Sequence, residues 1–205
     1  MGADTDEDIV RRYCETDDQR FFIELMGRYS NRLRRLLCTV IPGAPEDRED
    51  AEQEILSSLY TDLKHFRFQS TFATYFYRYC RNKAIDLIRR NQRERRKLAA
   101  LKLHVRTTSV PVSAEELVVR NERESEVIAA IMELPADDRA LLFLKESEGL
   151  SVADIAQILA IPEGTVKSRL HRARNRALAV LQLRERRHRF RVAGQPDLAQ
   201  ERGTV

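Results

Sequence analysis

The stretch from Leu150 to Leu181 constrains the fold most, because its pattern predicts two short helices joined by a tight turn. Ser151 and Asp154 have the residue types and the spacing of a capping box, which predicts the start of the first helix. The turn falls at Ala160, and Pro162 suits the first turn of the second helix, where its missing N–H costs nothing. A helix–turn–helix here commits the C-terminal part of the chain to a helical unit.

The second helix of this pair has an apolar back and a front rich in hydrogen-bond donors. Its apolar residues recur at spacings of four, three and four and share one face: Val166, Leu170, Ala173 and Ala177. The polar and basic residues point away or flank that face: Thr165, Lys167, Ser168, Arg169, His171, Arg172 and Arg174. Lys and Arg can pair with guanine edges and with phosphates in the major groove. A solvated basic face is the alternative, but the helix–turn–helix spacing favours DNA binding.

Composition agrees with an all-helical protein covered by charge. Of the 205 residues, 33% are charged and 42% hydrophobic, with only 7 Gly and 6 Pro, which favours helices over sheets. The net charge of +4 is modest, so DNA binding has to depend on where the charge lies. No apolar run is long enough to span a membrane and the acidic N-terminus lacks the pattern of a signal peptide. We therefore expect a cytoplasmic protein without membrane insertion.

The sequence gives little support to catalysis or to a metal site. It has no glycine-rich phosphate loop and no metal-ligand spacing, and its four His residues are scattered. The cysteines Cys14, Cys38 and Cys80 are odd in number and widely spaced, which argues against a disulfide framework. We expect no catalytic residue, no metal and no cofactor.

The N-terminal half begins with polar, acidic residues. Residues 1–17 are expected to be a flexible lead-in, with at most a helical turn around Ile9–Tyr13. Asp17 or Asp18 then caps the first firm helix, whose apolar residues recur every three or four positions: Phe22, Leu25, Tyr29, Leu33, Leu36 and Val40. A helix is predicted there, followed by a Pro- and Gly-containing loop.

A second helix is predicted over Asp47–His65, and its first turns are strongly acidic: Asp47, Glu49, Asp50, Glu52 and Glu54. Negative charge near the positive end of a helix dipole is favourable by itself. A docking surface for a basic partner is the other interpretation, and the residues alone leave both open.

A third helix is predicted from Phe72, capped by Ser70 or Thr71. It interleaves aromatic and basic residues: Phe72, Tyr75, Phe76, Tyr79, Lys83 and Arg89. Most of these aromatics suit the core. The same mixture also suits stacking on unpaired bases.

Residues Leu134–Leu178 closely resemble region 4 of bacterial sigma factors of the extracytoplasmic-function (ECF) class, most specifically over Ile161–Arg174 (IPEGTVKSRLHRAR). The resemblance implies contacts with the upstream (−35) promoter element from Thr165, Lys167, Ser168, Arg169, His171 and Arg172. Ala160 stands where the family usually has Gly. If that position needs a positive φ, Ala is strained by roughly 1 kcal/mol.

The N-terminal half resembles region 2 of the same family, over Asp47–Leu56 and Phe66–Arg90. The resemblance implies that core RNA polymerase is bound by Asp47, Asp50, Gln53 and Glu54. A loop that receives a flipped base of the downstream (−10) element would consist of Phe66, Arg67, Gln69, Ser70 and Thr71. The opened DNA would be contacted by Tyr75, Arg78, Asn82, Lys83, Asp86 and Arg89. Tyr75 departs from the usual Trp but keeps a stacking face.

Together these patterns predict an all-α protein of two small helical domains joined by a flexible linker. The expected divisions are a lead-in (1–17), a region 2-like domain (18–97), a linker (98–120), a region 4-like domain (121–183) and a basic, then disordered tail (184–205). The expected function is that of a sigma factor that binds core RNA polymerase and promoter DNA. An anti-sigma protein is a further partner by family analogy alone. The alternative is a conventional helix–turn–helix regulator with a sensing or dimerising N-terminal domain.

Overall fold

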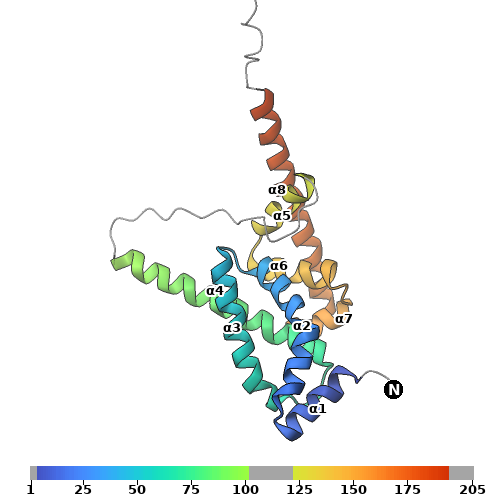
Figure 1. The fold of residues 1–205 in the computed structure, drawn as a ribbon. Coiled ribbons are helices and arrows are strands. Elements are labelled where there is room, and N and C mark those ends of the chain that lie inside the picture. Colours follow the sequence, from blue (N-terminus) through green and yellow to red (C-terminus); the bar gives the residue numbers. More distant parts are fainter. Residues whose placement is uncertain (1–3, 102–121, 194–205) are drawn as a thin grey trace, which may run out of the picture.

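The computed structural model describes residues 4–101 and 122–193, and predictions about residues 1–3, 102–121 and 194–205 lie outside this part of the chain. The described residues contain helices and no strand, which confirms the all-α class (Figure 1). The N-terminal domain consists of α1 (Asp6–Thr16), α2 (Gln19–Val40), α3 (Pro45–Asp62), the 3₁₀ turn η1 (Leu63–His65) and α4 (Phe72–Leu101). The C-terminal domain consists of α5 (Glu122–Met132), α6 (Ala136–Leu142), the π-helical turn η3 (Phe143–Ser147), α7 (Val152–Leu159) and α8 (Glu163–Ala193).

The expectation of a lead-in over residues 1–17 is wrong, because α1 is part of the core. Thr5 and Asp8 form a capping box at its start. Ile9, Val10 and Tyr13 are fully buried against the rest of the domain. The acidic residues around this short apolar pattern made the helix hard to predict from the sequence. The helix becomes stable only through its packing against α2.

The predicted helices of the N-terminal domain are otherwise present. Asp18 caps α2 by accepting from the Arg20 N–H at 2.9 Å, and the six apolar residues predicted for this helix are all buried. α3 begins at Pro45, before the predicted start, because Pro fits the first turn of a helix. η1 completes the predicted span to His65.

In the C-terminal domain, α8 is longer than predicted. It continues through residues 184–193, which were expected to belong to an irregular tail. Between Gly164 and Gly194 the chain contains no Pro or Gly, and Arg, Leu and Ala favour a helix even without an apolar stripe. Arg184 pairs with Glu133 of the loop after α5 at 2.6 Å, which supports this extension.

The two domains pack against each other along α2, α4, α6 and α7, and a continuous hydrophobic core extends through both. Arg139 of α6 donates to the backbone carbonyls of Thr39 and Val40 at the end of α2. Glu148 accepts a hydrogen bond from Tyr77 of α4 and pairs with Arg35 of α2 at 2.7 Å. Polar contacts therefore join the domains at the middle of α6 and directly after η3.

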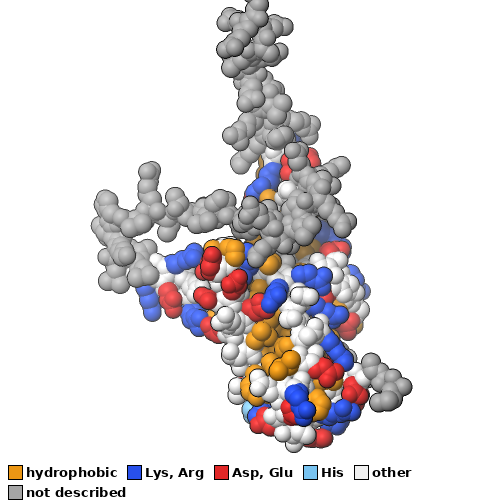
Figure 2. Space-filling view, viewed as in Figure 1, with side chains coloured by type: hydrophobic (Ala, Val, Ile, Leu, Met, Phe, Trp, Pro, Cys, Tyr) orange, Lys and Arg blue, Asp and Glu red, His pale blue; other side chains and the backbone are white. Residues whose placement is uncertain are grey.

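Charges of both signs are interspersed over the molecular face drawn in Figure 2, and hydrophobic side chains gather on its lower part. This face has no large patch of charges of one sign, in agreement with the modest net charge. In the described ranges, no helix is both long enough and apolar enough to cross a membrane.

Candidate nucleic-acid interface

The helix–turn–helix has the geometry that its sequence predicts. Ser151 and Asp154 form the capping box of α7. Ala160 ends α7 in the left-handed conformation, at φ 53° and ψ 45°, so this turn has the positive φ at which Ala is strained. Ile155 and Val166 are fully buried between α7 and α8, so the two helices hold one another at a fixed angle.

The front of α8 is the set of residues Thr165, Lys167, Ser168, Arg169, His171 and Arg172. Lys167, Ser168, His171 and Arg172 are exposed, while Thr165 and Arg169 are half-buried. Exposed donors on a helix held from behind suit a groove that displays base edges and phosphates.

Arg169 differs from the other basic residues of this front because it is already paired. Its guanidinium lies 3.4 Å from Asp138 of α6, which also pairs with Arg176 at 2.8 Å. Asp138 is buried, so these pairs fix α8 against α6. For Arg169 to contact a base, it would have to leave a partner that sequence reasoning did not identify.

The loop of residues 66–71 connects η1 to α4. Phe66 is buried and its ring centroid lies 4.8 Å from that of Tyr75, so it supports the loop from below. Arg67, Gln69 and Thr71 are exposed and Ser70 is half-buried. The Thr71 hydroxyl accepts from the Thr74 N–H at 3.2 Å, which makes Thr71 a cap of α4, as predicted.

The polar edge of α4 continues from this loop. Arg78, Asn82 and Asp86 are spaced by four residues, are exposed and share one side of the helix. Arg89 lies one turn further and pairs with Asp86 at 3.7 Å. The Lys83 ammonium lies 5.4 Å from the centre of the Tyr79 ring. This edge could follow a DNA strand away from the loop.

Tyr75 and Tyr79 belong to the aromatic cluster next to this edge, and both are half-buried. The Tyr79 hydroxyl donates to Asp62 at 2.7 Å, and burial together with this carboxylate raises the pKa of Tyr79. Tyr79 therefore stays neutral and anchors α4 to the end of α3.

The four residues of α3 that were expected to bind polymerase do not form one set. Asp47, Asp50 and Glu54 line a cleft of about 140 Å³ between α3 and α4, whereas Gln53 lines the neighbouring cleft between α2 and α3. Arg90 of α4 pairs with Glu54 at 2.8 Å and holds the pKa of that carboxyl below its usual value. Asp50 and Glu54 are both exposed, but Glu54 is already paired with Arg90, so Asp50 is better placed to meet an external cation.

Two residues that sequence reasoning missed lie at the 66–71 loop: Phe68 within it and Arg11 beside it. Phe68 is an exposed aromatic with a positive φ of 53°, and the guanidinium carbon of Arg11 from α1 lies 4.9 Å from the centre of its ring. Phe68 is part of the loop sequence FRFQST (residues 66–71), so its position could be read from the sequence. Only the fold brings Arg11 next to it.

No group of three or more His, Cys, Asp or Glu side chains that could hold a metal occurs within residues 4–101 and 122–193. The described surface has two candidate sites for nucleic acid: the front of α8, and the 66–71 loop with the adjoining edge of α4.

The family models of sigma-70 region 2 and sigma-70 region 4 match residues 25–94 and 124–176. The ECF RNA polymerase sigma-E factor of Haemophilus influenzae is 32% identical over 179 residues, which cover 83% of this chain and 92% of the relative. The ECF RNA polymerase sigma factor SigW of Bacillus subtilis is 31% identical over 163 residues, covering 77% of this chain and 87% of the relative.

A solved structure, the sigma factor RpoE in complex with the anti-sigma factor NepR from Bartonella quintana, has the same fold. Its TM-score is 0.62 at 22% identity, over 80% of this chain and 98% of that one. The two sigma regions in this order define an initiation factor of transcription. The chain belongs to the ECF class of RNA polymerase sigma factors. This assignment replaces the alternative of a conventional helix–turn–helix regulator.

Proposed function

We propose that this sigma factor binds core RNA polymerase through the acidic side of α3, opens the −10 element with the 66–71 loop and α4, and reads the −35 element with the front of α8. The observation that carries this proposal is that four of the six residues of the α8 front and the polar edge of α4 are exposed while the two domains are packed together.

The division of labour follows from the chemistry of the two surfaces. The α8 front presents Lys167, His171 and Arg172 on a helix that is held from behind, which suits duplex DNA. The 66–71 loop presents polar side chains next to closely packed aromatic rings, which suits a base taken out of the duplex.

The polymerase contact is assigned to Asp50, with Asp47, Gln53 and Glu54 beside it. Asp50 is an exposed carboxylate, and the relatives are named RNA polymerase sigma factors. Because Glu54 is already paired with Arg90, we assign it a smaller part in attracting a basic partner.

Three further proposals accompany this function. The sigma factor family is not an enzyme family in the catalytic sense, and we propose that this chain acts without a catalytic residue, metal or cofactor. We assign it to the cytoplasm, where the polymerase and the chromosome lie. An anti-sigma factor is a proposed partner because the structural neighbour is a complex with one.

The test is binding to purified core RNA polymerase, followed by transcription from a library of random promoters. Tight binding and transcripts from one class of two-part promoter are expected. Binding to duplex DNA as a dimer, without any polymerase association, would contradict the proposal.

The polymerase surface is tested by Asp50→Lys, with Glu15→Lys as the control. Both residues are exposed carboxylates, but Glu15 lies at the end of α1 and outside the proposed surface. We expect Asp50→Lys to lower the affinity for core polymerase and to leave folding unchanged, and Glu15→Lys to change neither. Equal affinities for the two variants would exclude this docking surface.

A further inference from the structure

Phe68, at the turn between η1 and α4, has a conformation that its own side chain does not favour. Its φ is 53°, in the left-handed region, where a bulky non-glycine residue is a genuine outlier. The residue is nevertheless 37% exposed, so burial does not explain why a large ring stands there. Backbone strain of this kind concentrates at functional sites.

The ring of Phe68 is held by aromatic and cationic neighbours. The Phe66 ring lies 4.8 Å from it at an interplanar angle of 53°, and the Arg11 guanidinium lies 4.9 Å from its centre. Phe66 in turn packs on Tyr75, so Phe68 extends this aromatic cluster from α4 to the surface. A ring that is both oriented and exposed is a preformed stacking surface.

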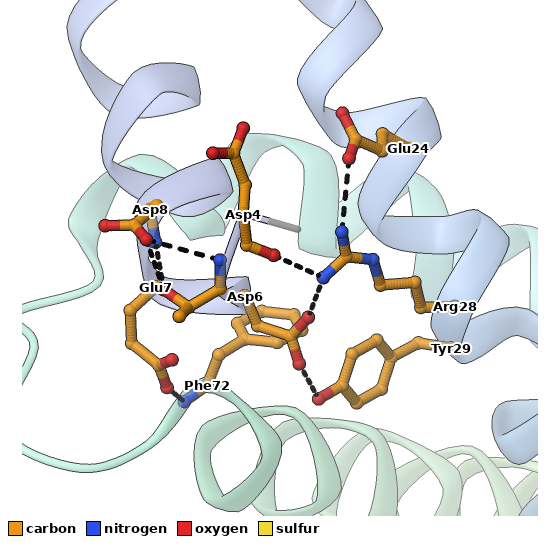
Figure 3. A network of polar contacts seen from close by, with 9 residues as sticks. Asp4, Asp6, Glu7, Asp8, Glu24, Arg28, Tyr29 and Phe72 are labelled. Atoms are coloured by element: carbon orange, nitrogen blue, oxygen red, sulfur yellow. Dashed lines mark hydrogen bonds and ion pairs between the residues drawn. The ribbon is translucent and has the colours of Figure 1, made fainter. Parts of the chain in front are cut away.

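The helix that carries Arg11, α1, is fixed relative to the 66–71 loop because hydrogen bonds and an ion pair join it to α4 and α2. The Glu7 carboxylate accepts the Phe72 N–H at 2.7 Å, and Asp6 accepts from Tyr29 at 2.5 Å and pairs with Arg28 at 2.8 Å (Figure 3). Glu7 also places a negative charge on the N-terminus of α4, where a phosphate could otherwise bind. A phosphate that approaches the loop is therefore favoured on the side of Arg11.

We propose that Phe68 and Arg11 form a further contact for an unpaired nucleotide of the opened promoter, in which the Phe68 ring stacks on the base and the Arg11 guanidinium pairs with its phosphate. This inference rests on the proposed function, because it needs the 66–71 loop to meet single-stranded DNA. It adds an aromatic residue and a residue from α1 to that site.

The decisive variant is Phe68→Gly, which removes the ring and suits a positive φ, so the loop keeps its conformation. Phe68→Tyr keeps an aromatic face. The control is Ile23→Ala, which shortens a 60% exposed apolar side chain on α2. Arg11→Ala is matched by Arg12→Ala on the same helix, because Arg12 lies over Phe21 and pairs with Asp4 instead.

The assay uses holoenzyme reconstituted with core polymerase and a forked promoter oligonucleotide with 2-aminopurine at successive unpaired positions. We expect Phe68→Gly to weaken binding to the fork by about five- to 100-fold and to remove the fluorescence quenching at one position. Phe68→Tyr should restore both. Arg11→Ala should weaken binding and lower the slope of log affinity against log salt by about one.

Binding to core polymerase and to duplex −35 DNA should be the same for all variants. If Phe68→Gly binds and opens promoters within about twofold of the wild type, this inference is wrong while the proposed function stands. If the wild-type holoenzyme does not bind the fork, the proposed function fails and this inference fails with it.

Discussion

Arg139 joins the two domains, and its replacement tests how strongly they are held together. The residue is only 5% exposed, and burial lowers its pKa. Its guanidinium donates to four backbone carbonyls. Two belong to the C-terminal domain, with Nη1 at 3.1 Å from the Met132 oxygen and 2.6 Å from the Leu134 oxygen. The other two end α2, with Nε at 2.7 Å from the Thr39 oxygen and Nη2 bonded to Val40.

The variant Arg139→Met keeps most of the apolar stem and removes all five donors. A hydrogen bond to a charged group contributes about 1.5–3 kcal/mol, and a buried carbonyl left unpaired costs about 1–3 kcal/mol. The carbonyls that end α2 regain water if the domains part, so only the two inside the C-terminal domain count in full. We therefore expect the free energy of unfolding to fall by about 3–5 kcal/mol.

The measurement is urea denaturation of the full chain followed by circular dichroism. Arg90→Met is the control, because the Arg90 side chain is 55% exposed and its partner Glu54 is 45% exposed. An exposed pair contributes about 0–1 kcal/mol. Arg139→Lys should lower the free energy of unfolding by most of the same amount, since a lysine ammonium cannot reproduce the planar set of donors of a guanidinium. A loss below about 1 kcal/mol for Arg139→Met, equal to that of the control, would refute this reasoning.

Four other predictions test local features. Ala160→Gly should raise the free energy of unfolding by about 0.5–1 kcal/mol, because Gly adopts the positive φ of this turn without strain; a lower melting temperature would contradict this. Arg169→Ala should weaken duplex binding by about 1–3 kcal/mol and alter the sequence preference; equal loss on all sequences would leave only a phosphate contact. Asp138→Asn should weaken the attachment of α8 to α6 and lower the free energy of unfolding. Comparison with Arg169→Ala then separates the structural role of Arg169 from its contact with DNA bases. Burial raises the pKa of the Cys80 thiol, so at neutral pH it stays protonated and should react with a thiol reagent only on unfolding; rapid labelling of Cys80 itself in the native protein, located by peptide mass spectrometry, would refute that burial.

The sequence by itself determined the helices whose signals are local. The stripe from Phe22 to Val40 fixes the buried face of α2, since residues three and four apart share a side of a helix. The capping box of α7 and the left-handed Ala160 likewise depend on a few adjacent residues. The exposure of Lys167 and Arg172 on the front of α8 follows from the same periodicity.

Only the tertiary structure decided which side chains meet across the chain. It buries α1 in the core, brings Arg11 to Phe68 and pairs Arg169 with Asp138. It also sets Arg139 against the end of α2. Helical periodicity states which face of a segment is apolar, but it does not state which partner covers that face or neutralises its charges. Those partners are chosen by packing between residues far apart in sequence, where burial strengthens a charge pair or makes an unpaired group costly.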